Sequence, residues 1–136
     1  NSVPGAHASR KAWWHSLELC IPCKYISSGK ACHSGHDCNY CHLPHENLGV
    51  IRRPRRPQRA RVRVIVDEVT EFATIDSVSF RMQLLSFARD SDAYSIMCLR
   101  AAVRRKLDTL TDERQKAELL AAYCDTFGGS SQEQAA

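Results

Sequence analysis

The chain has 136 residues and a formal net charge of +4, which is room for one ordinary domain or for a mini-domain beside a small one. No apolar stretch approaches the ~20 residues needed to cross a bilayer, which excludes a membrane span within the chain. The charge is uneven, because residues 1–64 carry eleven Lys/Arg against three Asp/Glu and residues 65–136 carry eight against twelve.

Residues 1–16 are small, polar and basic, and we expect a flexible segment there. Trp13 and Trp14 are the exception, since such a pair packs against a neighbouring surface or stacks on bases. The chain begins at Asn1 and not at methionine, so we expect a fragment or a processed product. Its cysteines favour a reducing compartment, nucleus or cytoplasm, and an organelle interior stays open as the alternative.

Residues 17–46 are rich in cysteine and histidine, with glycine and proline between them and no hydrophobic period. Cys23, Cys32, Cys38 and His42 follow one another with eight, five and three residues in between. Three thiolates and one imidazole in that order can close a tetrahedral zinc site. Because a segment this short cannot bury a core, the ion would have to stabilise it. We therefore expect one structural Zn²⁺ bound by these four side chains.

The same residues allow three other interpretations. Cys20–Cys23 and Cys38–Cys41 are two C-x2-C pairs, which would form a ribbon-type site of four cysteines. Cys38 to His42 also matches the C-x-x-C-H haem attachment sequence, and disulfide pairing is the third interpretation. In the four-ligand interpretation Cys20 and Cys41 are spare thiols, either packed against the metal-bound loops or serving as alternates in a redox- or metal-sensitive site.

The spacing C-x8-C-x5-C-x3-H resembles that of the CCCH-type zinc finger, in a single copy over about residues 17–46. Gly35 falls where that family's turn needs a glycine, whereas Ile26 and Ser34 stand where family members often carry aromatics. The resemblance implies a small metal-stabilised fold with little regular secondary structure. It also implies binding of single-stranded RNA, in post-transcriptional regulation.

RNA readers of this kind stack aromatic side chains on bases and hold phosphates with cations. Two tyrosines are the stacking candidates, and lysines and arginines are the candidates for phosphate contact. These RNA-binding candidates are Tyr25, Tyr40, Lys24, Lys30, Arg52, Arg53, Arg55, Arg56 and Arg59.

Residues 47–75 are predicted to be a basic linker rich in Arg and Pro. Pro54 and Pro57 are expected to prevent a continuous helix and to favour an extended path. Valines at alternate positions over 61–66 predict a short strand. Besides contact with phosphates, the arginines are compatible with a nuclear import signal or with a simply solvated run.

Residues 76–128 are predicted to be a small all-α segment of three helices, over about 76–89, 91–108 and 111–127, followed by a disordered tail over 129–136. The expected N-caps are Asp76, Ser91 or Asp92, and Thr111, and Gly128–Gly129 are expected to end the last helix. The expected apolar stripes are Val78, Met82, Leu84, Leu85 and Phe87; then Ile96, Leu99, Val103 and Leu107; then Ala117, Leu120, Ala121 and Cys124.

These elements together predict an RNA-binding module in which a zinc finger and an arginine-rich linker bind single-stranded RNA. The alternative is a structural or protein-interaction subunit, in which the zinc finger is a folding staple and the helical segment binds a protein partner or forms a homodimer. We do not expect an enzyme, because four protein ligands saturate the zinc and no nucleophile–base pair is present.

Overall fold

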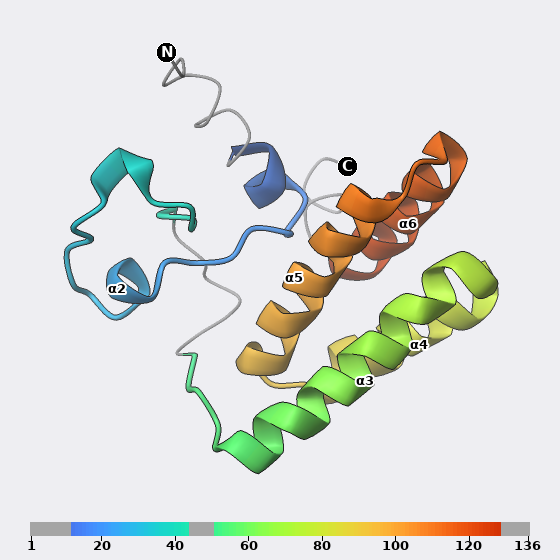
Figure 1. The fold of residues 1–136 in the computed structure, drawn as a ribbon, viewed down its shortest axis with the longest axis horizontal. Helices are drawn as coiled ribbons and strands as arrows, with labels where there is room; N and C mark the ends of the chain where they lie inside the picture. Colours follow the sequence, from blue (N-terminus) through green and yellow to red (C-terminus); the bar gives the residue numbers. More distant parts are fainter. Residues whose placement is uncertain (1–11, 44–50, 129–136) are drawn as a thin grey trace. The chain divides into compact units, whose positions relative to one another are not determined.

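The computed structural model describes residues 12–43 and 51–128, and the chain divides into two compact units between Ile51 and Arg52 (Figure 1). Predictions made for residues 1–11, 44–50 and 129–136, including the C-terminal tail, lie outside the described residues. In the described part the N-terminal unit holds the cysteine and histidine clusters and the C-terminal unit is helical.

The N-terminal unit has short helical turns joined by loops. Residues 12–16 are helical, α2 spans Lys24–Ser27, and the 3-10 turn η1 spans Gly35–Asp37. An isolated parallel bridge joins Pro22 to Cys41, where the Cys23 N–H donates to the Cys41 carbonyl at 2.8 Å and the Cys41 N–H donates to the Ile21 carbonyl at 2.7 Å. This bridge holds together two segments that are nineteen residues apart in the sequence.

Very little apolar surface is buried in this unit. Among residues 12–43, the buried residues are Trp14, Leu19 and Pro22 together with four cysteines, Cys20, Cys23, Cys38 and Cys41. Trp14 is buried, which fits packing of the pair and not base stacking by both rings, while Trp13, whose ring centroid lies 4.6 Å from that of Trp14, is about half exposed. So small a core points to an additional source of stability.

The basic linker predicted over 47–75 is largely wrong, because α3 spans Arg56–Ile75. Pro57 lies in the first turn of this helix, where the missing N–H would have no intrahelical partner anyway. The strand predicted over 61–66 is also wrong, because these residues lie inside α3. Val62, Val66 and Val69 recur at helical spacing and are buried, whereas Val64 is 57% exposed.

The three helices predicted after residue 75 are confirmed. They are α4 (Ser77–Asp90), α5 (Ala93–Thr109) and α6 (Glu113–Phe127), each within two residues of its predicted bounds. Asp76 and Asp92 cap α4 and α5 as predicted, since their carboxylates accept from the Val78 and Ser95 amides. The cap of α6 is Asp112 and not Thr111, because its carboxylate accepts from the Arg114 and Gln115 amides.

The predicted apolar stripes are partly correct for α4 and α5 and wrong for α6. In α5, Leu99, Val103 and Leu107 are buried as predicted and Ile96 is half-buried. In α4, Leu84 and Phe87 are buried as predicted together with Phe80, whereas Val78, Met82 and Leu85 are more than half exposed. In α6 the buried residues are Leu119, Ala122 and Tyr123, which were not in the predicted stripe.

Helix α3 organises the C-terminal unit, because it packs against α4, α5 and α6, while α4 also packs against α6 (Figure 1). The Arg81 guanidinium of α4 donates to the Asp125 carboxylate of α6 at 2.6 Å. The aromatic rings of Tyr123 and Phe127 stack with centroids 4.7 Å apart. Within residues 12–43 and 51–128, none of the helices has both the length and the apolar character to span a bilayer.

Candidate metal centre and basic groove

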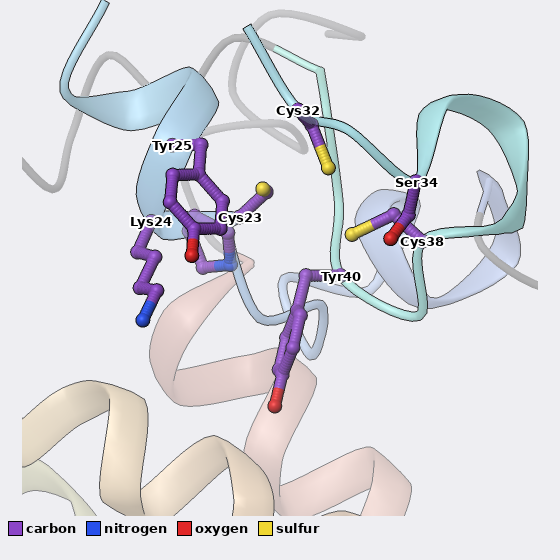
Figure 2. A pocket seen from close by; sticks show the side chains of 8 residues that line it. Cys23, Lys24, Tyr25, Cys32, Ser34, Cys38 and Tyr40 are labelled. Atoms are coloured by element: carbon purple, nitrogen blue, oxygen red, sulfur yellow. The ribbon is translucent and has the colours of Figure 1, made fainter. Parts of the chain in front are cut away.

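The structure brings together the four side chains predicted to bind zinc. The ligand atoms of Cys23, Cys32, Cys38 and His42 all lie within 4.8 Å of one another. Figure 2 shows the three cysteine side chains directed toward a common space. The ring nitrogen Nε2 of His42 is buried and has no hydrogen-bond partner among the described residues. We call these four residues the CCCH cluster; an ion bound there through Nε2 would satisfy that nitrogen, which is otherwise costly to bury.

Local backbone geometry positions the three thiols. Cys23 directly precedes α2, and Cys38 directly follows η1. Between Cys32 and Cys38 the chain turns at Gly35, whose φ of +53° lies in the left-handed region, and the Gly35 N–H donates to the Cys32 carbonyl at 3.2 Å. A side chain at this position would strain the turn, so the glycine expected from the motif has a structural reason.

The thiols of the CCCH cluster influence one another's ionisation. Burial opposes ionisation of Cys23, but the Ile26 and Tyr25 amides and the neighbouring thiols outweigh it, and the pKa of Cys23 is lowered. At Cys38 the Tyr40 amide favours the thiolate, yet burial and the nearby Cys32 and Cys23 raise the pKa. Thiolates this close repel one another, and a divalent cation at their centre would remove that penalty.

A second cluster contains the two thiols that the sequence left as spares. His15, Cys20 and Cys41 also place their ligand atoms within 4.8 Å of one another. His15 Nδ1 lies 3.4 Å from the Cys20 sulfur and 3.4 Å from the Cys41 sulfur. We call these three residues the HCC cluster, and the sequence did not lead us to predict it. The two C-x2-C pairs are a signal that could have revealed it, because each pair contributes one cysteine to each cluster. The four-cysteine ribbon site is therefore not the arrangement that the structure assembles.

Most of the RNA-binding candidates of the N-terminal unit surround the CCCH cluster. A cavity of about 400 Å³ beside it is lined by the three thiols and by Lys24, Tyr25, Ser34 and Tyr40, among others (Figure 2). Tyr25 is 41% exposed and Tyr40 is 51% exposed. The Lys24 ammonium lies 5.0 Å from the centroid of the Tyr25 ring. Lys30 is exposed but does not line this cavity.

Of the five arginines predicted to contact RNA, three line a groove in the C-terminal unit and two do not. A groove of about 530 Å³ between α3 and α5, which we call the basic groove, is lined by Arg53, Arg56, Arg59, Arg63 and Arg105, together with Tyr94, Cys98, Asp67, Ala60, Val66 and Ala101. Arg52 and Arg55 do not line it. Arg105 belongs to α5, and no sequence signal links it to arginines some forty residues earlier.

The basic groove is strongly positive, because five arginines face one aspartate. The Arg59 guanidinium donates to the Pro54 carbonyl at 2.9 Å, which ties the residues before α3 to its first turn. Burial raises the pKa of the Cys98 thiol, so this side chain stays neutral at physiological pH and adds no negative charge. The groove therefore suits an anion such as a phosphate.

No protein-family model, no curated protein and no solved structure matches this chain.

Proposed function

We propose that the CCCH cluster binds one structural Zn²⁺ as a CCCH-type zinc finger and that the protein binds single-stranded RNA. Three thiolates and one imidazole form a donor set that zinc prefers, and four protein ligands leave no position for substrate. The gathering of these four ligands around one space carries the metal part of the proposal. None of the seven cysteines is in a disulfide bond, and reduced thiols fit a nuclear or cytoplasmic protein.

The exposed rings beside the cluster support recognition of bases. Tyr25 and Tyr40 offer aromatic faces at the rim of the cavity, and Lys24 places a positive charge next to the Tyr25 ring. Bases that are splayed out of a single strand stack on such rings, and the adjacent ammonium attracts the phosphate. Ser34, where the family often has an aromatic, lines the same cavity and offers no stacking surface.

The basic groove supports binding of the RNA backbone. Arg56, Arg59 and Arg63 lie in the first turns of α3 and Arg105 lies in α5, so four of its five arginines are held by packed helices, while Arg53 precedes α3. Guanidinium groups bind phosphate oxygens in a bidentate manner, and several of them in one groove can follow a strand. Contact with phosphates gives affinity without base specificity, whereas the tyrosines would supply what base preference there is.

Replacement of Tyr40 tests base stacking. We expect Tyr40→Ala to weaken binding of an unstructured single-stranded RNA by about 1–3 kcal/mol, or roughly 5- to 150-fold in Kd. Fluorescence anisotropy on the zinc-loaded full chain at low salt measures this. Tyr40→Phe is the matched control, because it keeps the ring and should bind nearly as well as the wild type. If the wild type binds no unstructured RNA at low salt, the proposed function is wrong.

Replacement of an arginine in the basic groove tests the phosphate contacts. The logarithm of the binding constant should fall with the logarithm of salt concentration by about 0.7 for each phosphate neutralised on a single strand. We expect Arg56→Gln to reduce that slope by about 0.7, measured by anisotropy over a series of salt concentrations. Arg89→Gln, an exposed arginine of α4 outside the groove, should leave the slope unchanged. Equal slopes for all three proteins would remove the groove from the proposal.

A second candidate function rests on the exposed apolar residues of the C-terminal unit. Ile75, Val78, Met82 and Leu85 are each more than half exposed. Such side chains suit contact with a protein partner or a second copy of the chain. In that case the role of the zinc finger is only to stabilise the fold. Light scattering of the purified protein, with its nucleic-acid content measured on the same sample, distinguishes the two. A stable complex free of RNA that also fails to bind added RNA favours the subunit.

A further inference from the structure

We propose that the HCC cluster, formed by His15, Cys20 and Cys41, binds a second Zn²⁺, so that the N-terminal unit holds two ions. This goes beyond the single zinc of the proposed function and does not depend on RNA binding. It also assigns a role to the two cysteines that a single CCCH finger leaves without one.

The geometry of the three side chains is that of ligands around one ion. In a tetrahedral site with Zn–S near 2.3 Å and Zn–N near 2.1 Å, a ligand sulfur and nitrogen lie roughly 3.6 Å apart. His15 Nδ1 lies 3.4 Å from the sulfurs of both Cys20 and Cys41. One imidazole nitrogen has a single lone pair or a single proton, so two thiols at the same distance from it could share only a weaker, bifurcated hydrogen bond. An ion shared by all three side chains accounts for both distances.

The backbone separates the two clusters even though their ligands alternate along the chain. Cys41 lies in the bridge to Pro22, where the chain is extended. Successive side chains of an extended segment point to opposite sides, so Cys41 and His42 serve different clusters. On the other side of the bridge Cys23 also has an extended backbone, and Cys20 lies three positions before it. The paired segments therefore direct one set of ligands to each side.

Burial and charge also fit a bound ion. Cys20 is 3% exposed and Cys41 is 4% exposed. Two thiolates and a neutral imidazole around Zn²⁺ make a formally neutral centre, which is the least costly charge state in a buried position. Three protein donors leave one coordination position, which water or an added ligand would fill.

Zinc stoichiometry of the full chain tests the inference. The protein is purified in zinc under reducing conditions, and its zinc is measured by elemental analysis and native mass spectrometry. We expect two ions per wild-type chain and one fewer in Cys20→Ser and in Cys41→Ser. Cys124→Ser, a half-buried thiol of α6, is the matched control and should keep both ions. One ion per wild-type chain, or a mass two protons lower with a Cys20–Cys41 disulfide, would overturn the second site.

Two further variants separate this inference from the proposed function and from misfolding. Cys41→His keeps a zinc ligand, so it should restore the second ion that Cys41→Ser loses. If the wild type holds one ion that is lost in Cys23→Ser but kept in Cys20→Ser, the CCCH site stands and the second site is wrong. If the variants unfold and lose both ions, cobalt titration of the wild type decides. Saturation of the thiolate-to-cobalt absorption at two equivalents of cobalt supports two sites, and saturation at one equivalent contradicts the second site.

Discussion

Replacing Cys23 with Ser, or removing metal with a chelator, should unfold residues 12–43 and leave α3 to α6 intact. Among residues 12–43, the buried residues besides the cysteines are Trp14, Leu19 and Pro22. Burial of one such side chain contributes about 1.5–3 kcal/mol, whereas a structural zinc contributes about 10–16 kcal/mol of apparent folding free energy. Loss of the ion therefore removes most of what stabilises this unit.

Tryptophan fluorescence provides the measurement, because both tryptophans of the chain, Trp13 and Trp14, lie in the N-terminal unit. Chelation should shift the emission toward that of exposed tryptophan and leave the helical far-ultraviolet circular dichroism nearly unchanged. Cys124→Ser should behave like the wild type. Emission that does not respond to chelation would mean that the unit folds without metal.

The second large effect is expected in the core of the helical unit. Phe80→Ala should lower the free energy of unfolding by about 3–5 kcal/mol, because the Phe80 side chain is 1% exposed. Met82→Ala, two residues away on α4, should change it by about 0.5 kcal/mol or less, because Met82 is 66% exposed. Urea denaturation followed by circular dichroism measures both. A larger loss for Met82→Ala would show that the stripe expected from the sequence, and not the observed one, faces the core.

The sequence predicted the existence of α4, α5 and α6 well but not which face each buries. Val78, Met82 and Leu85 recur at helical spacing, and only packing against α3 and α6 shows that Phe80, with Leu84 and Phe87, faces the core in their place. In α5 the predicted Leu99, Val103 and Leu107 are buried, but so are Met97 and Ala102, which were not predicted. Rotation of a helix about its axis is decided by its neighbours, which a single sequence does not reveal.

Helix α3 was missed because two local signals were given too much weight. Pro57 breaks a helix in its interior but fits its first turn, and the bounds of the helix decide which case applies. Valines at alternate positions favour a strand, yet Val62 and Val66 also satisfy the helical period and are the ones buried. The helical pattern extends through Val69 and Ala73, and that longer pattern was the better indicator.

That Cys23, Cys32, Cys38 and His42 come together in a group that could hold an ion was predictable, because their spacing is specific. The HCC cluster was not found, since His15 lies outside the cysteine-rich run and its association with Cys41 depends on the bridge at Pro22. The basic groove was half predicted. Arg53, Arg56 and Arg59 were named from composition, but Arg105 joins them only through packing of α5 on α3.

Asp76 is at once the C-cap of α3 and the N-cap of α4, so these two helices meet with no linker between them. A helix rises 1.5 Å per residue, which places Arg59 about 24 Å along α3 from Ile75 at its far end. Helix α3 thus separates the arginines of its first turns from the exposed apolar side chains of Ile75 and Val78. If the two proposals are both right, a nucleic-acid strand at the arginines and a protein at Ile75 and Val78 would contact opposite ends of the same helix.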